Sequence, residues 1–301
     1  MNKFQLEVSQ AILTREQAVL RELERTYVQA LRNIDNQLTI FQGRVQTQSV
    51  FHQIQYRQNM QREINVIVVG LQSGNIATIQ SYMKEAYRMG FSGMHYSLNK
   101  NGIPILSSLD PNRMLAAINF QIEGLTFANR QHVHMETFKR QIAHALNQGI
   151  AQNWTYERIA QQISKNTREQ INNSYRIART EGARVSSEAN YQGMLQAQDA
   201  GADIVSEWSH AFNGDNSRDD HMALDGEIRE LGEYFETASG NRTLRPLGFG
   251  IPEEDIHCRC ILLQRARWVL SEEERQRRMI EIADLTQAKS FEDYHNQFYR
   301  R

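Results

Sequence analysis

The chain has 301 residues, which is enough for one large domain or two ordinary ones. Its 34 basic and 35 acidic side chains nearly cancel, and this balance argues against a protein that coats DNA with a uniformly basic surface. No apolar run approaches the roughly 20 residues needed to cross a bilayer, and the first residues lack the layout of a secretion signal. We therefore expect a soluble protein of a reducing cytoplasm, with no membrane among its partners.

Residues 1–100 are expected to form long helices. Apolar side chains recur there at steps of three and four, with Gln, Arg and Glu between them, as on one face of a helix. The first run comprises Leu20, Leu23, Tyr27, Leu31, Ile34, Leu38, Phe41 and Val45. A second run, which would form the other arm of a hairpin, comprises Ile54, Met60, Ile64, Ile67, Val68 and Leu71. A helical bundle that buries its own stripe explains this pattern better than a groove for a partner.

Residues 101–172 are expected to form a helical middle region. It follows a looser segment marked by Gly90, Gly93, Gly102 and Pro104. Asp110 followed by Pro111 predicts a helix start, because aspartate caps the first turn and proline suits its first position. The helical pattern resumes until about Gly149, and Thr155 is placed to cap a short helix.

Residues 173–270 are expected to form a compact α+β module. A helix from about Asn173 to Ala200 opens it, and the sequence then changes to short, partly alternating segments typical of strands. The expected strands are Ile204–Trp208, Gly226–Arg229 and Cys258–Leu263. The fold class predicted for the whole chain is therefore α+β and predominantly helical, with long N-terminal helices followed by a small module of short antiparallel strands.

Residues 271–301 are expected to form a C-terminal helix and tail. Ser271 and Glu274 have the spacing of a capping box. Past that helix, Phe291, Tyr294 and Phe298 lie on one helical face. Such a face either docks on a partner or folds back on its own domain, and the sequence leaves both alternatives open.

Four blocks stand out between Ile177 and Leu263, and their order carries more information than any one of them. They are Ile177-Ala178-Arg179-Thr180-Glu181, then Trp208, then Arg218-x-x-His221-x-x-x-Asp225-Gly226, and finally His257-Cys258-Arg259-Cys260. In this order the chain resembles the phage head-morphogenesis family typified by the Mu F-like minor head proteins. The helices that precede the blocks resemble that family only in length and texture.

The resemblance implies a function in the phage head. Minor head proteins of this family are present in low copy in the procapsid, associate with the portal protein and other capsid or scaffolding proteins, and assist head assembly and DNA packaging or ejection. The implied location is the virion or procapsid, assembled in the cytoplasm of a bacterial host. Contact with phage DNA stays open, but Arg275, Arg277 and Arg278 alternate with glutamates as on an ordinary solvated face.

Three residues offer ligands that suit a structural zinc ion, namely His221, Cys258 and Cys260. On the predicted strand both cysteines would point to one face. The fourth ligand would come from His257, Asp215, Asp219 or Asp225. The alternative, which the small number of thiols favours, is no metal, with two small buried cysteines and a histidine that hydrogen-bonds within its turn.

The remaining motif residues are assigned structural functions: Arg179, Glu181, Trp208, Arg218, Asp225 and Gly226. Gly226 would supply the positive φ of a turn after Asp225. Arg218 would bind Glu181 through two hydrogen bonds and so tie the helix to the strands.

No residue is predicted to be catalytic. The alternative is a metal-dependent hydrolase or nuclease, or a toxin-type module, built around His221 and the nearby aspartates. It is disfavoured because the sequence contains no H-E-x-x-H, Walker or G-x-S-x-G motif.

Overall fold

The computed structural model describes residues 1–45, 50–152, 154–210, 218–267 and 271–300, apart from the side chains of residues 41–54, 56 and 57. The chain divides into two compact units. One unit, called here the helical unit, comprises residues 18–80 and 125–178. The other, called the sheet unit, comprises residues 1–17, 81–124 and 179–301.

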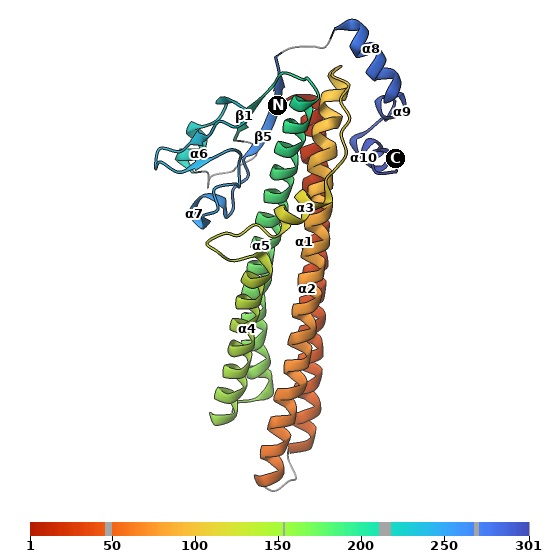
Figure 1. The fold of residues 1–301 in the computed structure, drawn as a ribbon. Coiled ribbons are helices and arrows are strands. Elements are labelled where there is room, and N and C mark those ends of the chain that lie inside the picture. Colours follow the sequence, from red (N-terminus) through yellow and green to blue (C-terminus); the bar gives the residue numbers. More distant parts are fainter. Residues whose placement is uncertain (46–49, 153, 211–217, 268–270, 301) are drawn as a thin grey trace. The chain divides into compact units, whose positions relative to one another are not determined.

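The helical unit consists of parts of four helices, which are α1 (Lys3–Val45), α2 (Val50–Lys100), α4 (Phe127–Ala151) and α5 (Tyr156–Asp199) (Figure 1). Their apolar stripes meet in one core, as the hairpin pattern predicted. The core includes Tyr27, Ile34, Leu38, Met60, Ile64, Val68, Phe138, Ile142 and Leu146. The predicted stripe residues Phe41, Val45 and Ile54 have side chains outside the described part of the chain.

Two predicted interruptions of the helices are wrong. The helix expected from about Asn173 begins already at Tyr156, so that α5 is continuous through the expected break. The looser segment expected around Gly90 is helical, since α2 continues to Lys100. Glycine is needed there for close packing: a Cβ atom on Gly90 would lie 2.3 Å from the backbone oxygen of Ser186 on α5.

The sheet unit contains a three-stranded antiparallel sheet of order β2-β1-β5. Its strands are β1 (Ile204–Ser209), β2 (Ile228–Glu230) and β5 (Ile261–Ala266), and a small ribbon adds β3 (Phe235–Glu236) and β4 (Arg242–Thr243). The pairings Ser206 with Arg229 and Ser206 with Gln264 set the register of the central strand. Two short helices, α6 (Asp219–Ala223) and α7 (Pro252–Asp255), lie in the connections between strands.

The rest of the sheet unit is helical. It includes α3 (Pro111–Ile118), which Asp110 caps as predicted, and α8 (Glu272–Glu281), which Ser271 caps. The chain ends with α9 (Ala283–Thr286) and α10 (Phe291–Phe298). The apolar face of α10 packs on its own unit, because Tyr294 is fully buried and its hydroxyl accepts a hydrogen bond of 2.6 Å from Asn99 on α2. Of the two alternatives for the tail, the structure shows the one that folds back.

The predicted fold class is confirmed: the chain is α+β and predominantly helical, with a small module of short antiparallel strands near its C-terminal end. Within the described residues, every helix is too short or too polar to cross a bilayer.

Candidate metal centre

His221 and the two cysteines come from two segments that lie far apart in the sequence. His221 lies in the short helix α6, whereas Cys258 and Cys260 lie between α7 and β5. The predicted strand Cys258–Leu263 is thus wrong in its first residues, because β5 begins only at Ile261. His257 has a φ of 64°, in the left-handed region, so the chain turns there and cannot continue a strand ladder.

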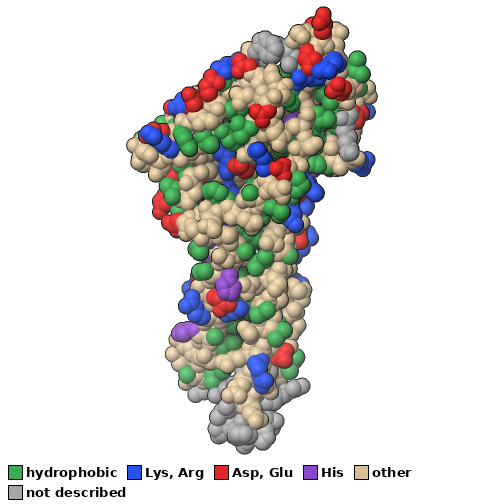
Figure 2. All heavy atoms as spheres, viewed as in Figure 1, with side chains coloured by type: hydrophobic (Ala, Val, Ile, Leu, Met, Phe, Trp, Pro, Cys, Tyr) green, Lys and Arg blue, Asp and Glu red, His purple; other side chains and the backbone are tan. Residues whose placement is uncertain are grey.

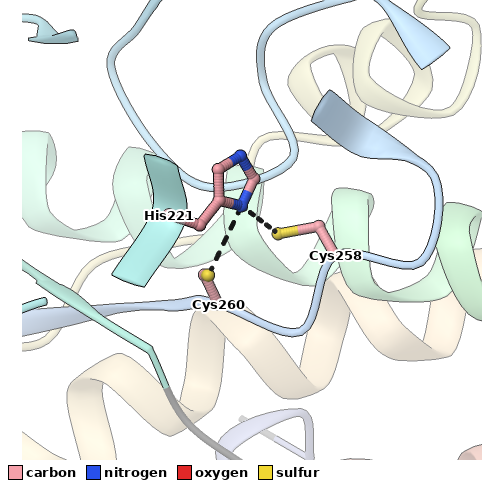
Figure 3. A group of neighbouring side chains, drawn as sticks. All are labelled: His221, Cys258 and Cys260. Atoms are coloured by element: carbon pink, nitrogen blue, oxygen red, sulfur yellow. Dashed lines mark hydrogen bonds between the residues drawn. The ribbon is translucent and has the colours of Figure 1, made fainter. Parts of the chain in front are cut away.

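The turn directs both sulfur atoms toward one ring nitrogen. The Nδ1 atom of His221 lies 3.5 Å from Sγ of Cys258 and 3.7 Å from Sγ of Cys260 (Figure 3). All three ligand atoms lie within 4.8 Å of one another. The structure therefore brings together the three residues that the sequence predicted as zinc ligands, through a turn and not through a common strand face.

The other ring nitrogen of His221 faces a carboxylate. Its Nε2 atom lies 2.7 Å from Oε2 of Glu254, which is itself buried in α7. The second oxygen of Glu254 accepts a hydrogen bond of 2.8 Å from the side-chain amide of Asn241. Glu254 is therefore held in place and fixes the orientation of the imidazole ring.

Aromatic side chains enclose the cluster. The ring of Phe249 stacks on His221 at a centroid distance of 5.7 Å, and Trp208 meets it edge-on at 5.5 Å. His221, Cys258 and Cys260 keep only 2%, 4% and 2% of their surface exposed. The cluster is consequently closed to solvent and to any sizeable substrate.

The three groups change one another's proton affinity. Burial lowers the pKa of His221, but the hydrogen bond and charge of Cys258, and then Glu254, outweigh it and raise this pKa above its ordinary value. The hydrogen bond from Cys260, followed by the effect of His221, holds the pKa of Cys258 well below its usual range. The same contact and burial raise the pKa of Cys260. These pKa shifts favour a thiolate at Cys258 next to a protonated imidazole at His221.

The other predicted ligands lie elsewhere. Asp215 is outside the described residues, and the side chains of Asp219 and His257 are exposed. Asp225 accepts a hydrogen bond of 2.7 Å from the backbone N–H of His210. In the described part of the chain, His221, Cys258 and Cys260 form the single group of three or more such side chains that could hold a metal ion.

The turn at Asp225-Gly226 connects α6 to the sheet. Gly226 has the predicted positive φ, at 80°, and its N–H donates to the backbone oxygen of Trp208 at 2.9 Å. In return the N–H of Trp208 donates to the backbone oxygen of Glu227 at 2.9 Å. The turn therefore holds Trp208 at the end of β1, next to the imidazole of His221.

The predicted ion pair between Arg218 and Glu181 is wrong, because each side chain has another partner. Glu181 accepts two hydrogen bonds, of 3.0 and 2.8 Å, from the guanidinium of Arg184, and both residues are fully buried. Arg218 instead donates to the backbone oxygen of Ile256 at 2.5 Å. Glu181 meets the nearer arginine one helical turn away, and Arg218 fixes the segment that leads to the cysteines.

A glutamate that the sequence did not single out connects two of the motif blocks. Glu16 on α1 is buried and accepts hydrogen bonds of 2.8 and 3.0 Å from Arg259, the arginine between the two cysteines. Arg179 lies 3.4 Å from the same carboxylate. A sequence signal existed, because Glu16 falls on the apolar stripe that continues through Leu20 and Leu23, where a charge needs a partner.

Comparisons with known proteins point to one family and two relatives. Residues 140–263 match the family described as "Phage Mu protein F like protein". The chain is 24% identical over 300 residues to the NAD(+)--arginine ADP-ribosyltransferase EFV of Enterococcus faecalis, an alignment that covers 98% of this chain and 60% of that protein. It is 30% identical over 122 residues to the Minor head protein GP7 of Bacillus phage SPP1, covering 40% of this chain and 39% of that protein.

The chain thus spans less than two thirds of the length of either relative. No solved structure matches it at a significant level. The family match, from residue 140 to residue 263, contains α6, α7 and every residue of the candidate metal centre.

Proposed function

Since residues 140–263 belong to the Phage Mu F-like family, as the four motif blocks predicted, we propose that the protein is a minor head protein of a bacteriophage. It enters the procapsid in the host cytoplasm, contacts the portal protein and other capsid or scaffolding proteins, and assists head assembly and DNA packaging or ejection. The observation that carries the proposal is the family match, and the relative from phage SPP1, named a minor head protein, supports it.

The surface of the helical unit supports a function in protein contact. Val66 and Val69 on α2 are 66% and 42% exposed and lie one helical turn apart. Burial of these apolar side chains against a partner would lower the free energy, because it removes them from water. Val133 on α4 is 55% exposed in the same unit. Single exposed apolar residues are ordinary, but a pair on one helix face is a suitable contact for an assembly partner.

The charges on the surface give less support to contact with DNA. The arginines that the sequence offered for it have carboxylate partners: Arg277 and Arg278 both bind Glu274, and Arg275 lies 3.5 Å from Glu272. Figure 2 shows basic and acidic side chains interspersed on the visible face. We therefore propose protein contacts as the main interaction and leave phage DNA as a secondary one.

Particle composition tests the proposal directly. Procapsids and DNA-filled heads from the phage that encodes the chain would be purified and analysed by quantitative mass spectrometry. The expected result is that the chain is present in procapsids in far fewer copies than the major capsid protein, and that it co-purifies with the portal protein when both are co-expressed. Absence from procapsids would contradict the proposal.

A double variant then tests the contact surface. Val66→Glu with Val69→Glu is expected to reduce incorporation into procapsids, because it places charges where an apolar contact is proposed. Leu115→Glu is the matched control, since Leu115 is an apolar residue of the sheet unit with 47% exposure. Unchanged incorporation of the double variant would remove α2 as the contact and leave the head assignment standing.

The residues around His221 argue against the enzymatic alternative. A hydrolase centre would need His221 to share a metal ion with nearby aspartates, yet among the described residues the metal-binding group around His221 contains two cysteines and no aspartate. The ADP-ribosyltransferase relative extends well beyond the aligned region, so its named activity is not transferred to this chain. Purified protein is expected neither to cleave DNA with divalent metals nor to transfer ADP-ribose from NAD to a cell lysate, and either activity would favour the alternative.

A further inference from the structure

We propose that His221 Nδ1 and the Sγ atoms of Cys258 and Cys260 bind a zinc ion, which fastens α6 to the segment that leads into β5. This inference goes beyond the function in the phage head and does not depend on it. It rests on three observations: the distances from Nδ1 of His221 to the two sulfur atoms, the carboxylate on the far imidazole nitrogen, and the burial of the cluster.

The distances fit a tetrahedral zinc centre. With Zn–S bonds of about 2.3 Å and Zn–N bonds of about 2.0–2.1 Å, tetrahedral angles place nitrogen and sulfur ligands about 3.6 Å apart. The two observed separations from Nδ1 of His221, 3.5 Å to Cys258 and 3.7 Å to Cys260, lie on either side of this value. Both nitrogen–sulfur separations are thus those of a tetrahedral zinc centre, and the three ligand atoms lie within 4.8 Å of one another (Figure 3).

Glu254 orients the imidazole of His221 for metal binding. An imidazole that donates its proton from Nε2 to Glu254, at 2.7 Å, has a lone pair at Nδ1. Both sulfur atoms lie within 3.7 Å of this nitrogen, so that one metal ion would bind Nδ1 and both thiolates at once. A carboxylate on the far nitrogen is the usual support of a metal-bound histidine.

Burial and donor type select the ion. Thiolate and imidazole ligands suit zinc, while magnesium and calcium prefer oxygen. The indole N–H of Trp208 is buried in the same cluster as Cys260 and makes no other hydrogen bond within the described residues. It would be available to donate to a metal-bound thiolate.

The arrangement supports a structural ion and not a catalytic one. Glu254, the nearest candidate for a general base, faces the far side of the imidazole from both sulfur atoms. The three ligands are almost fully buried, so that a substrate has no access to the ion. The ion would instead fasten α6 to the segment before β5, next to the apolar core that includes Trp208, Phe235 and Leu262.

Metal analysis tests the proposal. The full chain, purified without chelator, is expected to contain about one zinc ion per molecule, and both His221→Asn and Cys260→Ser are expected to lose it. His257→Asn is the matched control, since it changes an exposed histidine next to Cys258, and asparagine tolerates the left-handed backbone there. Zinc retained by His221→Asn, or lost from His257→Asn alone, would overturn the assignment.

Two measurements on the wild-type chain avoid variants that fail to fold. Removal of the metal with a chelator is expected to lower the melting temperature by several degrees, and added zinc should restore it. Replacement by cobalt is expected to produce the visible bands of a tetrahedral ion with thiolate charge transfer. Wild-type protein that contains no metal, takes up no cobalt and has two freely alkylated cysteines or a Cys258–Cys260 disulfide would overturn the proposal.

Discussion

The two units of the chain differ in the charged groups that they bury. In the helical unit, apolar side chains from four helices fill the core, and their spacing repeats along the sequence. The sheet unit also has an apolar core, but it buries the candidate metal centre and charged residues such as Glu181, Arg184 and Glu254 as well. Apolar packing is collective and tolerates small losses, whereas a buried polar group depends on one particular partner.

This difference predicts that the sheet unit is more sensitive to single changes than the helical unit. A buried charge that loses its partner has no water to replace it. A core that loses one methyl group keeps nearly all of its contacts. Three experiments test this difference between the units, in order of decreasing expected effect.

The largest effect is expected for Glu181→Leu in the sheet unit. The substitution leaves the guanidinium of Arg184, which is fully buried, without the carboxylate that accepts its two hydrogen bonds. Breaking a buried pair in this way typically costs about 3–5 kcal/mol of unfolding free energy. Urea denaturation followed by Trp fluorescence, with hydrogen exchange to localise the change, would measure it.

The double variant Glu181→Leu with Arg184→Met is the control for this prediction. It removes both charges, and we expect it to recover most of the lost stability because no unpaired charge remains. If the double variant is no more stable than Glu181→Leu, the cost arises from packing and the contrast between the units weakens.

The next effect concerns acid pH and is expected in the sheet unit. His95 is fully buried, and burial lowers its pKa to about 4, an effect that the hydrogen bond with the backbone oxygen of Ile105 opposes. The native chain therefore keeps His95 neutral while the unfolded chain protonates it below about pH 6.5. The stability that this neutral form contributes is present above pH 6.5 and is lost as the pH falls to about 4, by about 3 kcal/mol in all.

Hydrogen exchange at several pH values, compared between wild type and His95→Gln, would measure this effect. The variant cannot titrate at this position, so we expect it to lose less stability between pH 6.5 and pH 4 than the wild type does. Peptides from the helical unit serve as the internal reference. Equal acid sensitivity of wild type and variant would show that other groups cause the pH dependence.

The smallest effect is expected for Ile142→Val in the helical unit. Ile142 is 3% exposed and lies in the apolar core, and removal of one methyl group there typically costs about 1 kcal/mol. Val133→Ala, at an exposed position on the same helix, should leave the unfolding free energy nearly unchanged. A loss at Ile142 as large as that of Glu181→Leu would contradict the proposed difference between the units.

Much of the fold could be predicted from the sequence because it follows from local rules. The stripe through Leu20, Leu23 and Tyr27 indicated a buried helix face, and all three residues are buried. Asp110 before Pro111 indicated the start of α3, where the aspartate side chain accepts from the N–H of Asn112. Such signals depend on residues within a few positions of one another, so that a single sequence displays them.

The candidate site could be predicted only in part. Residue chemistry alone was enough to select His221, Cys258 and Cys260, but it placed the cysteines on a strand that begins only at Ile261. Two buried partners were not predicted: Glu254, which contacts His221, and Glu16, which accepts hydrogen bonds from Arg259. The second pair is separated by 243 positions, and no local pattern connects residues so far apart.

Most of the helices, their caps, the resemblance to a family and the three candidate ligands could be predicted from the sequence because each depends on residue type and short spacing. Which charges meet depends on the tertiary structure. It paired Glu181 with Arg184 and not with Arg218, and it turned the chain at His257 so that two sulfur atoms face one nitrogen. The physical reason is that a buried polar group takes the partner that the packed backbone brings within about 3 Å, and that backbone is set by contacts along the whole chain.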